Sequence, residues 1–339
     1  MHTSRQRRVA WLSIALAFGL VAAACGSDDG DAGAEATEAD GEGGGSINIS
    51  GSSTVEPISS LVAEAFMVEN EGVEIAVDGP GTGDGFELFC NGETEISDAS
   101  RPISDEEAAQ CEENGVEYVE LQIAYDGMAV MTSVDNDQVE CLNFADLYAL
   151  VGPEAEGTSN WSDVQAIATE LGSDTQLPDA ELVLTGPGTE SGTYDSFIEI
   201  ALEDHAEARG QETTTRTDYA SSADDNVIVA NIESSATSLG WVGFAFAGVA
   251  GDPVRTIPSA AEPGGECVEP TPETISDGSY PLSRPLFIYV NTAKAEENAA
   301  LADFVDFYLE GLDGFVEEGG YVTMPDDQVE ATREAWESR

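Results

Sequence analysis

The feature that most constrains this fold is a pattern that occurs three times. An apolar run ends in a loop of glycine and hydroxyl residues, and a helical pattern follows; the loops are residues 51–54, 79–83 and 187–193. Strands that alternate with helices predict mainly parallel sheets covered by helices, which bind ligands beyond the carboxyl ends of their strands. The chain of 339 residues is long enough for two such sheets, so we expect two lobes with a cleft between them.

Periodicity along the rest of the chain predicts further elements of both kinds. The predicted strands are residues 46–50, 72–79, 118–134, 180–186 and 284–291, and the predicted helices are residues 56–68, 84–90, a segment ending near 202, and 298–310. The long strand region 118–134 is expected to be interrupted at Asp126 and Gly127.

The N-terminus has the features of an export signal. Three arginines precede an apolar run that ends before Cys25, which predicts a signal peptide over residues 1–24. The "AAACGS" ending resembles a bacterial lipobox, which implies a lipid on Cys25 and a place at the outer face of the cell membrane. Ordinary cleavage without a lipid is the alternative. Beyond Cys25, residues 26–46 contain almost no apolar side chains, so we expect segment 25–46 to be a disordered acidic tether.

Charge excludes one class of partner. The chain has 67 acidic and 11 basic residues, a formal net charge of -56, and its only lysine is Lys294. Nucleic-acid binding is excluded because phosphate backbones require a basic surface. An anion can be bound here only through local attraction, since the long-range field of the protein repels it.

The cysteines are consistent with export. With Cys25 lipidated, four remain, and we favour the pairs Cys90–Cys111 and Cys141–Cys267 among the three possible pairings. A zinc site is the competing interpretation, but the chain has no CxxC spacing and two histidines. We therefore expect no metal ion and no cofactor.

The three loops could bind a small oxyanion without a basic patch. Glycine lets the backbone approach a ligand closely, and the first turn of a helix presents unpaired N–H groups and a partial positive charge. Neutral hydroxyl donors accompany them at Ser53, Thr54, Thr82, Ser191 and Thr193. The alternative for each loop alone is that its hydroxyl only caps the helix.

An arginine stands in a similar context. Ser100 and Arg101 precede Pro102, which disfavours a helical conformation at Arg101. The planar guanidinium suits bidentate contacts with oxyanions. A surface ion pair with one of the many carboxylates is the alternative role.

Several segments together resemble one family, the substrate-binding proteins of bacterial phosphate ABC transporters (PstS-type). They are, in chain order, "GSST", "GPGTGDGFELFCNGETEISDASRPI", "YDGMAV", "GPGTESGTYDSF" and "TDYASSADDNVIV". The resemblance implies a two-lobed periplasmic-binding-protein-like α/β fold (type II), with a mixed, mainly parallel sheet in each lobe and the ligand in the cleft. The expected lobes are 47–131 plus 258–339 (lobe I) and 132–257 (lobe II).

The resemblance also implies function: binding of inorganic phosphate with high affinity outside the membrane, and its delivery to the permease subunits of an ABC transporter by a monomer. The implied phosphate ligands are Ser53, Thr54, Thr82, Ser100, Arg101, Ser191, Gly192 and Thr193.

The chain departs from the family pattern at two of its polar positions. Many members have an arginine where this chain has Pro187, so either Arg101 acts alone or Arg216 joins it, and we favour Arg101. Members use an aspartate to accept a proton from phosphate, and Asp126 is the expected substitute for it; a role in a turn beside Gly127 is the alternative.

Two other functions were weighed. A secreted phosphatase or serine hydrolase is disfavoured because Gly-x-Ser-x-Gly is absent and His205 lies among acidic residues, so we expect no enzyme. A binding protein for another tetrahedral oxyanion, such as molybdate, or an adhesive protein on the same scaffold, is the remaining alternative.

Overall fold

The computed structural model describes residues 45–189, 191–248 and 250–339. The predicted signal peptide, Cys25 and most of the predicted tether therefore lie outside the described residues, and strand β1 begins at Ser46. In the described part of the chain, no helix combines the length and the apolar character needed to span a membrane.

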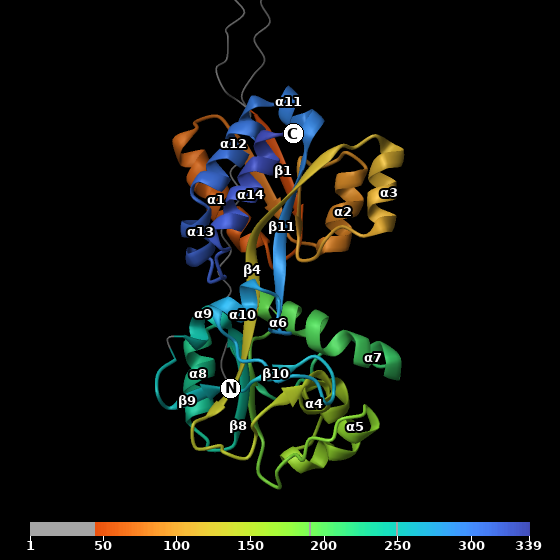
Figure 1. Cartoon of the computed structure of the whole chain (residues 1–339), viewed down its shortest axis with the longest axis vertical. Coiled ribbons are helices and arrows are strands. Elements are labelled where there is room, and N and C mark those ends of the chain that lie inside the picture. The colour runs from red at the N-terminus through yellow and green to blue at the C-terminus, as the bar shows by residue number, and fades with distance from the viewer. Residues whose placement is uncertain (1–44, 190, 249) are drawn as a thin grey trace, which may run out of the picture. The chain divides into compact units, whose positions relative to one another are not determined.

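The first sheet forms the base of lobe I. Its strand order is β2-β1-β3-β11-β4, in which β1 pairs in parallel with β2 and β3, and β11 is antiparallel to both of its neighbours. The strands are β1 (Ser46–Gly51), β2 (Glu74–Asp78), β3 (Ile96–Ala99), β4 (Tyr118–Ser133) and β11 (Ser283–Asn291). Its helices are α1 (Glu56–Glu69), α2 (Thr82–Cys90), α3 (Asp105–Asn114), α11 (Thr292–Glu297), α12 (Ala299–Glu310), α13 (Leu312–Glu318) and α14 (Asp326–Glu337). Figure 1 shows α1, α12 and α14 on one side of this sheet and α2 and α3 on the other.

The second sheet forms the base of lobe II. Its order is β4-β8-β6-β7, with β6 parallel to both of its neighbours and β4 antiparallel to β8 and β9. The strands are β6 (Val183–Gly186), β7 (Ala220–Ser221), β8 (Ser238–Gly243) and β9 (Val254–Thr256). The helices are α4 (Phe144–Val151), η1 (Pro153–Ala155), η2 (Trp161–Val164), α5 (Gln165–Glu170), α6 (Gly192–Phe197), η3 (Ile198–Leu202), α7 (Glu203–Arg209), α8 (Asp225–Glu233) and α9 (Phe244–Ala247).

Strand β4 belongs to both sheets. Its first part pairs with β11, and the part from Met128 to Met131 pairs with β8. The expected interruption at Asp126 and Gly127 was wrong: the strand runs through both residues because β11 pairs with them in register. Figure 1 shows β4 as one long strand. These features make a two-lobed α/β fold with mixed sheets.

A small third unit joins two distant segments. Strand β10 (Ser259–Ala260) pairs with β5 (Leu142–Asn143), and α10 (Pro272–Ser276) follows. The cysteines pair as the sequence analysis favoured, in the disulfides Cys90–Cys111 and Cys141–Cys267. The second disulfide and the β5–β10 pair place the segment after Ile257 beside the start of lobe II. The division of the chain into the two predicted lobes stays a prediction.

Aromatic packing fixes the helix that carries the third loop. Phe197, at the end of α6, stacks on Trp241 of β8 with ring centroids 4.6 Å apart and an interplanar angle of 21°. A side chain at Gly186 would place its Cβ 2.5 Å from the Trp241 ring, so the end of β6 has room only for glycine. Stacked aromatic pairs of this kind add about 0.5–1.5 kcal/mol beyond their buried area.

Candidate functional site

The first loop leads into α1 without using its hydroxyls as caps. Gly51 has φ 153°, and a Cβ there would collide with the carbonyl oxygen of Asp98, so only glycine fits. The N-cap of α1 is Val55, and among the described residues no side chain caps this helix. Ser53 Oγ instead donates to Asp195 Oδ2 at 3.0 Å, and Thr54 Oγ1 lies 3.1 Å from Ser196 Oγ. The expected unpaired N–H groups are not found at the start of α1: Val55 and Glu56 donate to the Ser52 carbonyl, and Pro57 has no N–H.

The second loop and the segment after β3 meet through hydroxyls. Thr82 Oγ1 lies 3.0 Å from Ser100 Oγ, and it accepts a hydrogen bond from the Ser100 backbone N–H at 3.2 Å. Helix α2 begins after Gly81, whose φ is 120°, and no described side chain caps it. Both helices of lobe I that follow a glycine and hydroxyl loop thus begin without a side-chain cap.

The third loop differs, because here the capping interpretation is correct. Ser191 is the N-cap of α6, and its Oγ accepts from the Thr193 backbone N–H at 3.2 Å. Gly192 packs closely on the first loop, since a Cβ there would lie 3.5 Å from the Thr54 Cα. One turn further on, Asp195 and Ser196 form the contacts with Ser53 and Thr54 described above. The first and third loops therefore lie against each other.

Arg284 joins these groups, and the sequence analysis did not single it out. It lies near the start of β11, and its side chain is 12% exposed. Its Nη2 donates to Thr54 Oγ1 at 3.0 Å and to Ser196 Oγ at 2.7 Å, and its Nη1 donates to Glu199. The guanidinium thus bonds to the first loop of lobe I and to α6 and η3 of lobe II.

Asp126 lies beside the same guanidinium. The two residues are cross-strand partners, and Asp126 Oδ2 is 3.6 Å from Arg284 Nε. Both atoms are buried, and neither has a hydrogen-bond partner within the described part of the chain. Burial raises the pKa of the Asp126 carboxyl, and the charge of Arg284 opposes that rise. The strand pairing therefore presents one donor and one acceptor side by side.

The C-terminal segment supports the first loop from behind. Tyr321 donates from its hydroxyl to the Thr54 carbonyl at 2.6 Å, and Val322 forms an antiparallel bridge with Tyr125 of β4. Burial raises the pKa of the Tyr321 phenol, with a further rise from Asp126, so the hydroxyl stays a donor at neutral pH.

The two arginines expected from the sequence have their guanidinium groups bonded to other residues. Arg101 is 45% exposed and donates from Nη1 and Nη2 to the two carboxylate oxygens of Glu107, each at 2.8 Å. Arg216 is 3% exposed and is bonded within lobe II to Thr158 and to Asp218. Arg216 is therefore held away from the loops, whereas Arg101 stays near them.

A polar pocket of about 550 Å³ connects the lobe I loops to Arg284. Its lining includes the predicted residues Thr82, Ser100 and Arg101, together with Glu199 and Glu203 of lobe II. In the described part of the chain, no group of three or more His, Cys, Asp or Glu side chains is placed to hold a metal ion.

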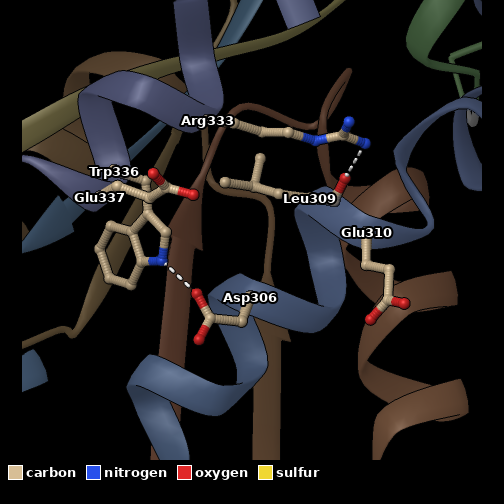
Figure 2. A pocket seen from close by; sticks show the side chains of 6 residues that line it. All are labelled: Asp306, Leu309, Glu310, Arg333, Trp336 and Glu337. Carbon is tan, nitrogen blue, oxygen red and sulfur yellow. Dashed lines mark hydrogen bonds between the residues drawn. The ribbon is translucent and has the colours of Figure 1, made fainter. Parts of the chain in front are cut away.

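A second cavity, of about 430 Å³, lies between α12 and α14 and is lined by Asp306, Leu309, Glu310, Arg333, Trp336 and Glu337. Figure 2 shows Trp336 Nε1 donating to Asp306 and Arg333 donating to the Leu309 carbonyl. Three carboxylates line this cavity, and its one lining arginine already donates to the chain, so it is a poor anion site.

Comparisons with known proteins identify the family. The family model described as "PBP superfamily domain" matches residues 36–310. The chain is 39% identical over 284 residues to the protein SphX of Synechocystis sp., covering 83% of this chain and 79% of that one. It is 34% identical over 285 residues to the phosphate-binding protein PstS of Staphylococcus saprophyticus, covering 84% and 82% respectively.

Among solved structures, it matches a possible phosphate binding protein from Planctomyces limnophilus with a TM-score of 0.77 and 35% identity, covering 87% of this chain and 99% of that one. The PstS relative is named a binding protein and the Planctomyces limnophilus structure a possible one, and neither name implies an enzyme activity. The chain therefore belongs to the PBP superfamily and, within it, to the family of PstS-type substrate-binding proteins.

Proposed function

We propose that this protein binds inorganic phosphate outside the cell membrane and passes it to the permease of an ABC transporter. The names of its relatives, phosphate-binding protein PstS among them, support this ligand. The observation that carries the proposal is Arg284, whose guanidinium, in a side chain only 12% exposed, lies between the hydroxyls of Thr54 and Ser196, one from each lobe.

The contacts of Arg284 suit a small tetrahedral oxyanion. A guanidinium offers a planar fork for two anion oxygens, and charge-assisted hydrogen bonds of this type are among the stronger ones. Neutral hydroxyl groups surround the fork: those of Thr54, Ser196, Thr82 and Ser100. In this structure the hydroxyls bond to one another, and we expect phosphate oxygens to take those hydrogen bonds over.

Arg101 and the third loop complete the proposed set of phosphate ligands. Arg101 lines the pocket, but its fork is occupied by Glu107, so we rank it second to Arg284. Ser53, Ser191, Gly192 and Thr193 remain proposed ligands because the first and third loops pack together. Arg216 is not proposed as a phosphate ligand, since its guanidinium nitrogens donate to groups inside lobe II.

Asp126 is the proposed acceptor for a phosphate proton. Its unpartnered Oδ2 lies 3.6 Å from the unpartnered Nε of Arg284. A single P–OH oxygen placed against both atoms could donate to the carboxylate and accept from the guanidinium. Sulfate has no proton at neutral pH, so it would meet the carboxylate acceptor to acceptor, and specificity for phosphate follows.

The proposal also covers location. We infer that Cys25 carries a lipid and that the acidic segment after it tethers the protein to the outer face of the membrane. An exported monomer with a lipid anchor is suited to act as a receptor that delivers its ligand to permease subunits.

Isothermal titration with phosphate and with sulfate tests the ligand. We expect the wild-type protein to bind phosphate and to bind sulfate far more weakly. Asp126→Asn should narrow the ratio of the two affinities about 10- to 100-fold, because an unsatisfied buried polar contact costs about 1–3 kcal/mol. Asp277→Asn removes the same charge at an exposed position and serves as the control.

A folded protein that does not bind phosphate would overturn the proposed function. An unchanged phosphate-to-sulfate ratio in Asp126→Asn would overturn the role of Asp126 alone.

A further inference from the structure

Glu199 forms an ion pair with the guanidinium of Arg284, and both residues line the pocket. It lies in the π-helical turn η3, directly after α6, and it accepts a hydrogen bond from Arg284 Nη1. The same carboxylate lines the 550 Å³ pocket with Thr82, Ser100 and Arg284. Its side chain is 49% exposed, so it faces solvent as well as the arginine.

The other partners of Arg284 are buried. Thr54 and Ser196, which accept from Nη2, and Asp126, which lies opposite Nε, are each at most 5% exposed. Glu199 is therefore the one exposed group among these partners, and it lines the pocket together with Arg284. An anion that binds Arg284 Nη1 from the pocket would have to take the place of the Glu199 carboxylate.

The charge of Glu199 acts on the rest of the pocket as well. It contributes to raising the pKa of the Asp126, Asp195 and Glu203 carboxyls and of the Arg101 guanidinium. A negative field that favours protonation of these groups also opposes the arrival of a second anion.

We propose that Glu199 is a built-in competitor of the ligand: its carboxylate takes the place of an anion on Arg284, and phosphate must displace it to bind. This inference rests on the proposed phosphate function. Displacement is feasible because the Glu199 side chain is half in solvent and can turn outward. Glu199 thereby weakens phosphate binding. It also disfavours any ligand whose contacts with Arg284 are no stronger than those of a carboxylate.

The test is titration with inorganic phosphate of the full-length protein and three variants at one pH and one salt concentration. Glu199→Gln removes the charge and the ion pair, and Glu199→Asp keeps the charge but shortens the reach by one methylene. Glu203→Gln is the matched control, because Glu203 lines the same pocket and is not an ion-pair partner of Arg284 in the described structure. Thermal unfolding without phosphate checks that each variant is folded.

We expect Glu199→Gln to bind phosphate about fivefold or more tightly than wild type, as for loss of a partly exposed competing ion pair. Glu199→Asp should also bind more tightly, by about twofold, and Glu203→Gln should stay within about twofold of wild type. If Glu199→Gln binds no more tightly than Glu203→Gln, or more weakly than wild type, the competition is overturned. A wild-type protein that does not bind phosphate would instead overturn the proposed function, and the competition with it.

Discussion

Replacement of Arg284 by alanine should weaken phosphate binding far more than the same replacement at Arg101. Truncating one partner of a buried, hydrogen-bonded charge contact costs about 2–5 kcal/mol, which is about 30- to 5000-fold in affinity. Arg284 is 12% exposed and bonds to both lobes, so the full range applies to it. Arg101 is 45% exposed and paired with Glu107, so we expect its loss to cost less than about fivefold.

Loss of Arg284 also affects the fold, and the experiment has to separate the two effects. Without the guanidinium, Asp126 is a buried carboxylate with no positive partner, a change that costs about 3–5 kcal/mol in comparable buried pairs unless the group takes up a proton. Arg284→Lys keeps the charge and loses the planar fork. The double variant Arg284→Ala with Asp126→Asn removes both charges, so it should recover stability and still bind phosphate poorly.

The assay is isothermal titration with phosphate, with thermal unfolding of each ligand-free variant alongside. Larger loss of affinity in Arg101→Ala than in Arg284→Ala, with both variants folded, would refute the reasoning. The sequence-based interpretation, in which Arg101 is the principal guanidinium, would then stand.

Two further predictions concern the support of the site. Burial raises the pKa of Asp98 to about 7, from 3.8, and a carboxyl with a raised folded-state pKa costs stability as pH rises from about 4 to about 7. Asp98→Asn should therefore have a free energy of unfolding up to about 4 kcal/mol higher than wild type at pH 8, and one close to wild type at pH 4. Urea denaturation measures both values. The same difference between variant and wild type at the two pH values would contradict this prediction. Tyr321→Phe removes the hydrogen bond to the Thr54 carbonyl, so it should lower the free energy of unfolding by about 1–3 kcal/mol and weaken phosphate binding; unchanged stability and affinity would argue against this support.

Local pattern was sufficient for much of the fold. The five predicted strands, the four predicted helices and the two disulfide pairs are present, whereas β3, α3 and α14 were among the elements not predicted. The interruption expected at Asp126 failed because a polar residue in an apolar run has two local interpretations, a turn or a functional strand position. Pairing with β11 makes this position part of a strand, and the residues near Asp126 in the sequence carry no signal of that pairing.

The arginines show the limit most clearly. The tripeptide Ser-Arg-Pro occurs twice: residues 100–102 follow β3 directly, and residues 283–285 begin β11. The repeated tripeptide was a signal that could have brought Arg284 into consideration. Ser196 carried a weaker signal, four residues after Gly192 and thus on the same face of the helix.

What the sequence determined by itself is the kind of chemistry: glycine loops, hydroxyl donors, few cations and an exported, acidic chain. The tertiary structure alone decided which arginine serves that chemistry. Arg101 forms an ion pair with Glu107, which lies six residues away at the start of α3, so this pair forms within one segment. Arg284 lies beside Asp126 because β11 pairs with β4 across more than 150 residues of sequence. It bonds to Thr54 and Ser196 because the two lobes meet at this arginine. A side chain's environment at such a place is set by strand register and lobe contact, which the neighbouring residues in sequence do not specify.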